Sequence, residues 1–184
     1  AHPAGALGHL RMGLSRVAPL LRAVDAVNEA AGRLAGVLAA VLVALVFGRV
    51  LARYAFNAGS VAAQEAVLWL HAALFLLGLG YTLRHDGHVR VDVFSQRWSA
   101  RARARVTLVA TLALLLPFCV FMLAMSWDYV AASWAAREGS RDPGGLPAWY
   151  LLKALIPLSA GLLFLQGLAE TVRAWHRARG GDGA

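Results

Sequence analysis

Residues 106–127 read VTLVATLALLLPFCVFMLAMSW, an uncharged run between Arg105 and Asp128. A helix needs about 20 mostly apolar residues to cross the hydrocarbon core of a bilayer, so this run predicts a transmembrane helix. Three similar runs lie at 34–48, at 66–83 and at 149–169, the last interrupted only by Lys153. The sequence therefore predicts an all-α membrane protein, a single domain over 1–184 with four spans at about 31–51, 64–84, 105–128 and 148–170.

The composition agrees with a membrane protein. Of the 184 residues, 59% are hydrophobic and 15% are charged, which is too apolar for an ordinary soluble domain of this size. The net charge of +8 does not indicate nucleic-acid binding, because the arginines stand in blocks between apolar runs and not on one basic face. We expect a multi-pass protein of a cell membrane that contacts lipids and no nucleic acid.

The distribution of arginine predicts the orientation. Arginines gather in the N-terminal segment, in the loop between the second and third spans and in the C-terminal tail, whereas the other two loops hold few. Because short cytoplasmic loops carry an excess of Lys and Arg, both termini are predicted to be cytoplasmic.

The segment before the first span has its own pattern. Apolar residues recur there every three or four positions, with arginines between them, which predicts an amphipathic helix in the headgroup plane. Pro19 favours two shorter pieces, the second beginning near that residue. A flexible basic tail is the alternative. The recurring apolar residues are Leu7, Leu10, Leu14, Val17, Leu21 and Val24.

Small residues recur every fourth position in the first span and form one stripe. Such a stripe lets another helix approach closely, although an alanine-rich span also produces this spacing by chance. The stripe consists of Gly32, Gly36, Ala40, Ala44 and Gly48.

Two features of the third span predict local structure. Pro117 removes a backbone hydrogen bond in mid-helix, so a kink or a reorganised turn is expected. Ser99 is expected to cap a helix that runs straight into the span. The Pro- and Gly-rich stretch 138–147 before the fourth span predicts turns without helix or strand.

The sequence offers little chemistry. No nucleophile motif, phosphate loop or metal-ligand spacing stands out, and the nearest approach, His85, Asp86, His88 and Asp92, is explained by solvated loop charges. His71 is the one histidine within a span, whereas haem in a helical bundle usually needs two on facing helices. We therefore predict no enzyme activity and no cofactor.

Acidic residues occur only at span edges in these four runs, at Glu65, Asp128 and Glu170. A transporter that acts alone normally carries acids or broken helices near the bilayer centre. This pattern favours a chain that assists a larger membrane partner.

Three blocks of sequence resemble a known family. The first joins Arg53, Tyr54, Ala55, Phe56 and Asn57 to Gln64, Glu65 and the run 74–78. The second is YTLRHDGHVRVD at 81–92. The third comprises Gly145, Leu146, Pro147, Trp149, Lys153, Pro157 and Gln166. In order and spacing they are similar to the small membrane subunit of tripartite ATP-independent periplasmic (TRAP) transporters, the DctQ-like family. Two departures are Gln64, where the family often has a second acid, and Ala73, near which it often has tryptophan.

The resemblance implies a helper subunit in a bacterial inner membrane. It would brace a large membrane subunit, which binds sodium and substrate, while a periplasmic binding protein delivers an organic acid. An intramembrane electron carrier using His71 and a self-contained small channel or exporter are the alternatives. Candidate contacts with a partner or with lipid are Arg53, Glu65, His88, Asp92, Glu138, Trp149 and Lys153.

Overall fold

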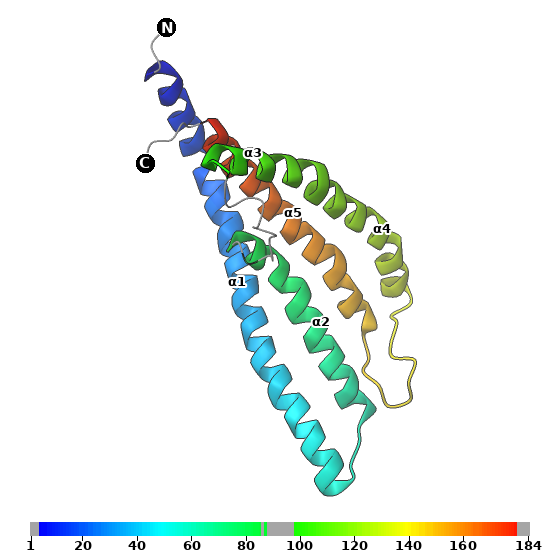
Figure 1. The fold of residues 1–184 in the computed structure, drawn as a ribbon. Helices are drawn as coiled ribbons and strands as arrows, with labels where there is room; N and C mark the ends of the chain where they lie inside the picture. Colours follow the sequence, from blue (N-terminus) through cyan, green and yellow to red (C-terminus); the bar gives the residue numbers. More distant parts are fainter. Residues whose placement is uncertain (1–3, 86, 88–97, 180–184) are drawn as a thin grey trace.

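A computed structural model describes the backbone of residues 4–85, 87 and 98–179, and their side chains from residue 17 onward. The described chain holds only helices and the loops that join them, so the predicted all-α class is confirmed (Figure 1). Four helical segments are long and apolar enough to cross a membrane. The elements are α1 (Ala4–Phe56), α2 (Val61–Arg84), α3 (Ala100–Ala110), the π-helical turn η1 (Thr111–Leu115), α4 (Leu116–Ala135) and α5 (Trp149–Arg179).

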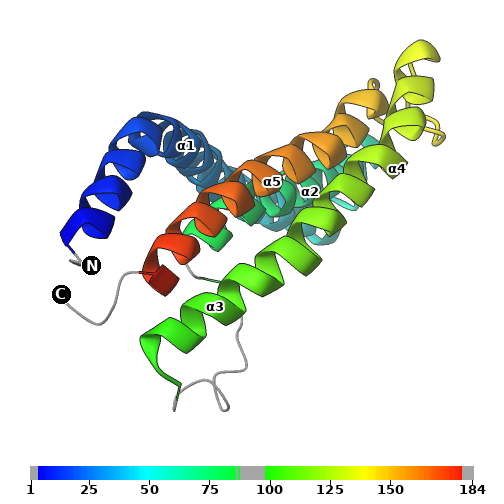
Figure 2. The same cartoon turned by 90° about the horizontal axis from the view of Figure 1, so that it is seen from above.

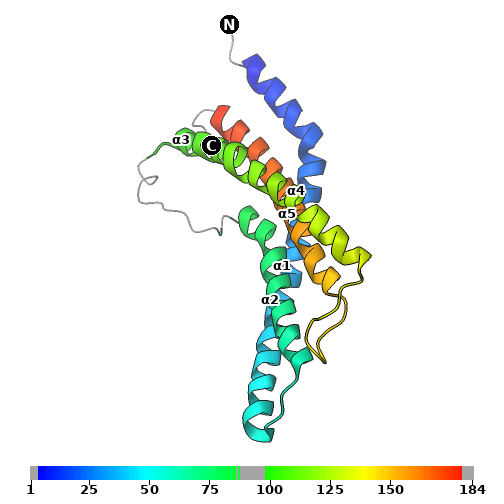
Figure 3. The same cartoon turned by 90° about the vertical axis from the view of Figure 1, so that its right-hand side faces the viewer.

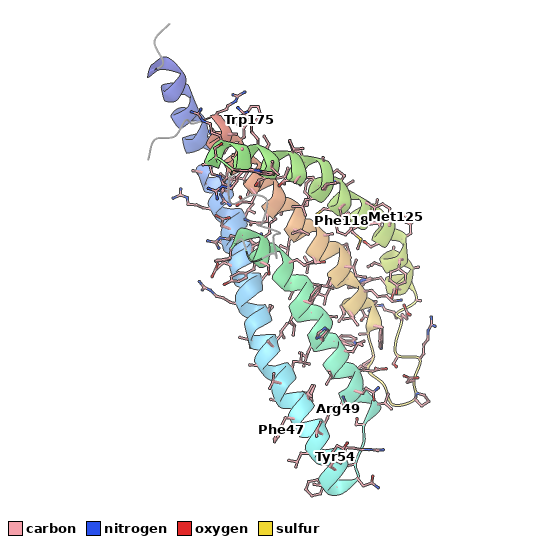
Figure 4. The ribbon with its side chains drawn as sticks, in the orientation of Figure 1. Phe47, Arg49, Tyr54, Phe118, Met125 and Trp175 are labelled. Carbon is pink, nitrogen blue, oxygen red and sulfur yellow. The ribbon has the colours of Figure 1, made fainter. Side chains whose placement is uncertain are left out.

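The helices form an open slab and not a closed bundle. Among the described residues, α2 packs between α1 and α5, and the continuous α3–η1–α4 segment packs on α5 alone (Figures 1 and 2). The N-terminal end of α1 and the C-terminal end of α5 lie at one end of the slab, and the α1–α2 and α4–α5 loops lie at the other (Figure 1). Phe47 of α1 and Met125 of α4 stand exposed at its two outer edges (Figure 4).

The first helix is much longer than its predicted span. It runs 53 residues without a break through Pro19, so the prediction of two separate pieces was wrong. Figures 2 and 3 show the N-terminal part of α1 bent away from the rest, which is how a helix accommodates an internal proline without ending. That this part lies in the headgroup plane stays a prediction.

The third membrane-spanning segment has the local structure that the sequence predicted. The Ser99 side chain accepts a hydrogen bond from the Ala102 backbone N–H at 3.2 Å, which confirms the predicted cap. The π-turn η1 ends two residues before Pro117, and the Leu116 N–H bonds to the Thr111 carbonyl. Proline lacks an N–H and clashes with the carbonyl four residues back, so the wider turn is the reorganisation that the sequence predicted.

The last loop and helix complete the frame. As predicted, the stretch 138–147 contains neither helix nor strand. Helix α5 begins at Trp149 but continues to Arg179, nine residues past the expected end at 170. Within these last turns, Arg173 pairs with Asp25 of α1, as described next.

Candidate functional site

Polar side chains gather in two layers, one at each end of the slab. The termini-side layer joins α1, α2 and α5 through Asp25, Asn28, Glu29, Arg84, Gln166, Glu170 and Arg173. The loop-side layer joins α2, α4, α5 and the α4–α5 loop through the side chains of Glu65, Ser133, Glu138, Ser140 and Lys153 and the backbone N–H of Leu146.

Asp25 is the centre of the termini-side layer. Its carboxylate lies 2.5 Å from Arg173 Nη2 of α5 and 3.8 Å from Arg84 Nε of α2. It also accepts a hydrogen bond from Gln166 Nε2 at 3.3 Å. One carboxylate of α1 thus binds both neighbouring helices.

About one turn after Asp25 on α1, a buried amide pair joins α1 to α5. Asn28 Nδ2 donates to Gln166 Oε1 at 3.0 Å, and these residues are 1% and 0% exposed. Asn28 Oδ1 has no hydrogen-bond partner among the described residues and lies against Gly80 of α2. A Cβ at Gly80 would stand 1.8 Å from this oxygen, so only glycine permits the approach.

The remaining charges of this layer are also paired. Glu29 lies 2.7 Å from Arg84 Nη1 and 3.5 Å from Arg33 Nε, one helical turn along α1. Glu170 lies 2.8 Å from Arg173 and 3.1 Å from Arg177. The layer is therefore a clamp between three helices, and its acids are occupied by arginines of the same chain.

In the loop-side layer, Glu65 fastens the α4–α5 loop to α2. Its carboxylate accepts hydrogen bonds from the Ser140 hydroxyl and, at 2.6 Å, from the Leu146 backbone N–H. Gly145 makes this possible, because a Cβ there would stand 2.2 Å from Ser140 Oγ and 2.7 Å from Glu65 Oε1. The loop is thereby held against the start of α2.

Glu138 makes the second attachment. Lys153 Nζ of α5 binds its carboxylate, and Ser133 Oγ donates to the same oxygen at 2.6 Å. These two hydrogen bonds hold the pKa of Glu138 below its ordinary value. Lys153 also lies 4.2 Å from the ring centroid of Tyr129, a cation–π distance.

The two layers are spaced like the two faces of a bilayer. At 1.5 Å per residue, Glu65 and Arg84 stand about 28 Å apart along α2, and Lys153 and Arg173 about 30 Å apart along α5. A hydrocarbon core is about 30 Å thick. Arg33 is the one charged residue of α1 between Glu29 and Arg49, and its ion pair with Glu29 shows the side chain reaching back toward the termini-side layer.

Comparison with known proteins decides the family. Residues 24–177 match the family described as "Tripartite ATP-independent periplasmic transporters, DctQ component". The chain belongs to the DctQ family. As a member with four spanning helices, it is a multi-pass protein of the bacterial inner membrane and a small subunit of TRAP type.

One curated DctQ protein is similar over part of this chain. The "C4-dicarboxylate TRAP transporter small permease protein DctQ" of Vibrio cholerae serotype O1 is 34% identical over 83 residues. The match covers 45% of this chain and 35% of the Vibrio protein, so the chain spans about a third of the length of that relative. No solved structure matches the chain.

The structure places most of the residues that were expected to contact a partner of this DctQ chain. Glu65 binds Ser140 and Leu146 of the α4–α5 loop, and Glu138 binds Lys153, so these three side chains have partners within the chain. Trp149 packs edge-on against Trp69 at 6.2 Å between ring centroids, and Arg53 is exposed near the end of α1. His88 and Asp92 lie outside the described residues. That any of them meets a partner or lipid stays a prediction.

The small-residue stripe divides in two. Gly32 packs against Tyr81 of α2, where a Cβ would come within 2.2 Å of the ring. Gly36, Ala40, Ala44 and Gly48 are exposed, and Gly36 and Gly48 have nothing within 4 Å of a built Cβ. The stripe thus turns away from the described helices of this chain, and its packing against a partner remains a prediction.

Sequence reasoning missed the termini-side layer. Its members recur at helical spacing, with Asp25, Asn28 and Glu29 on α1 and Gln166, Glu170 and Arg173 on α5, so each set lies on one face. That periodicity was the available signal. It was overlooked because all of these residues except Gln166 stand at or beyond the ends of the apolar runs that define the spans. Among the described residues, no three His, Cys, Asp or Glu side chains group closely enough to hold a metal ion.

Proposed function

We propose that this chain is the stationary helper subunit of a TRAP-type transporter, which braces a large membrane subunit during sodium-driven uptake of an organic acid. A periplasmic binding protein delivers that solute, and sodium binds the large subunit. The observation that carries the proposal is the DctQ match over residues 24–177. The name of the Vibrio relative specifies C4-dicarboxylates, which are among the organic acids proposed here.

The arrangement of polar groups supports a bracing role. In the described part of the chain, charged groups between the helices lie in the two layers and are paired there, so the apolar middle offers a solute no charged path. Clamped layers on both sides of an open slab resist sliding of one helix past another. A subunit that stays still in the bilayer must resist such sliding.

The orientation belongs to the same proposal. The N-terminal end of α1 and the C-terminal end of α5 lie at one end of the slab, and the arginine bias favours the cytoplasm for that end. The loop-side layer then faces the periplasm, where the binding protein works.

Co-expression tests the proposal. The large TRAP membrane subunit should form a complex with this chain that survives purification in mild detergent, and deletion of this chain should abolish uptake. Normal uptake without this chain would refute the bracing role. Solute flux through liposomes that hold this chain alone would instead indicate a self-contained channel.

A further inference from the structure

One histidine lies on an uncovered face of α2 and at a depth where a bilayer has no water. His71 follows Glu65 by about 9 Å along the helix and precedes Arg84 by about 20 Å. It therefore stands between the two polar layers, within the thickness of the hydrocarbon core. Its side chain is exposed, and no hydrogen bond joins it to any described residue.

The uncovered face extends over four turns. Its members recur at three and four residues, and the opposite face, with Glu65, Leu77 and Gly80, is buried against the rest of the slab. Leu68 is 53% and Phe75 is 62% exposed, and a Cβ built at Gly78 would find open space. This α2 face consists of Val61, Gln64, Leu68, His71, Phe75 and Gly78.

Lipid alone does not satisfy this face. A neutral imidazole has one donor and one acceptor nitrogen, and acyl chains can pair with neither. Arginine or lysine at this depth could extend its long stem toward the headgroups, as Arg33 reaches back to Glu29, but the short histidine side chain cannot. Polar residues inside spans normally face protein or a water-filled cavity.

The outer edges of the slab differ in this respect. Phe47 on α1 and Phe118 and Met125 on α4 are exposed and apolar, so acyl chains solvate them fully (Figure 4). Among the described residues, the α2 face combines bulky side chains, open space at Gly78 and a polar group without a hydrogen-bond partner, about 9 Å inside the Glu65 layer.

We propose that this α2 face docks a transmembrane helix of the large subunit, and that a hydrogen-bonding group of that helix pairs with His71. The inference rests on the proposed function, which supplies the membrane partner. Docking on α2 leaves the two outer edges of the slab to lipid.

Site-specific photo-crosslinking in cell membranes tests the location. A benzophenone amino acid replaces Leu68 or Phe75 on the α2 face, or Phe121 on α4 as a control of matched exposure at 59%. Irradiation should join the first two variants to the large subunit and leave the Phe121 variant uncrosslinked. Crosslinks to a second copy of this chain, or crosslinks to the large subunit from Phe121 only, would overturn the proposal.

Substitution of His71 tests the hydrogen bond. His71→Leu should reduce the large subunit recovered with this chain roughly fivefold to tenfold, whereas His71→Gln, which keeps a donor and an acceptor, should retain most of it. Phe121→Leu should have no effect. Membrane levels of each variant show whether it folds. Equal recovery with Leu and Gln at position 71 would remove the proposed pairing.

Recovery of the large subunit with the wild-type chain distinguishes failure of the proposed function from failure of the proposed docking site. If the wild-type chain fails to recover the large subunit, the bracing function itself fails. If it recovers the large subunit but crosslinks from another face, only the docking site is wrong.

Discussion

Asn28 of α1 donates a hydrogen bond to Gln166 of α5 at 3.0 Å, between two residues that are 138 positions apart in the sequence and almost completely buried. The pair lies next to the ion pairs of Asp25 and so continues the clamp toward the apolar middle. A buried amide pair favours one register of the two helices, because sliding either helix leaves both amides unpaired.

Gln166→Leu should destabilise this clamp. The substitution removes one partner each from Asn28 and Asp25, and buried groups left unpaired cost about 1–3 kcal/mol. Thermal unfolding of the purified chain in detergent measures the loss. Leu165→Ala, at an exposed neighbouring position, should change the unfolding temperature much less.

Gly80→Ala should also destabilise the protein, because the new methyl group would overlap Asn28 Oδ1. Gly78→Ala, two residues earlier on the same helix, meets open space. Alanine favours a helix over glycine by about 1 kcal/mol, so the Gly78 variant of the isolated chain should be as stable as wild type or slightly more stable. Equal unfolding temperatures for the two variants would contradict the close approach of α1 and α2.

Glu65→Ala should release the α4–α5 loop. Ser140 and the Leu146 N–H lose their acceptor, so trypsin should cleave after the exposed Arg137 and Arg141 about tenfold faster, if the loop attachment is worth about 1.4 kcal/mol. Gln64→Ala serves as control, because Gln64 bonds only weakly with Arg49, at 3.5 Å. An unchanged cleavage rate in the Glu65 variant would show that the loop is held by other contacts.

The pH dependence of the Glu138 attachment follows from its lowered pKa. A carboxylate whose pKa is lower in the folded state stabilises that state above its unfolded pKa, near 4.5, and this contribution is lost as pH falls through the folded pKa. The difference in unfolding temperature between wild type and Glu138→Gln should therefore be constant above about pH 5.5 and shrink below pH 4.5. A difference that shrinks near neutral pH would contradict the ion pair with Lys153.

Cysteine labelling tests the orientation. Ala58 and Ala100 are suitable sites for a labelled cysteine, because both are exposed and, unlike the nearby Ser60 and Ser99, neither caps a helix. In a Cys119→Ala background, an impermeant thiol reagent applied from the periplasm should label Ala58→Cys and spare Ala100→Cys. The opposite pattern would place both termini in the periplasm.

The helical frame was readable from the sequence because each of its signals is local. Uncharged runs of about 20 residues specify spans in any surrounding, and Ser99 and Pro117 act on the backbone within one or two turns. The helix ends were read less well, since α1 and α5 extend into charged residues that hydropathy excludes.

The sequence by itself determined that this chain has four apolar helices, an α3–α4 bend at Pro117 and a place in the DctQ family. Only the tertiary structure decided that Asp25 meets Arg173, that Glu65 holds the α4–α5 loop and that His71 stays uncovered. The physical reason is that periodicity assigns a residue to a face of its own helix, whereas which helix covers that face depends on contacts between residues far apart in the chain.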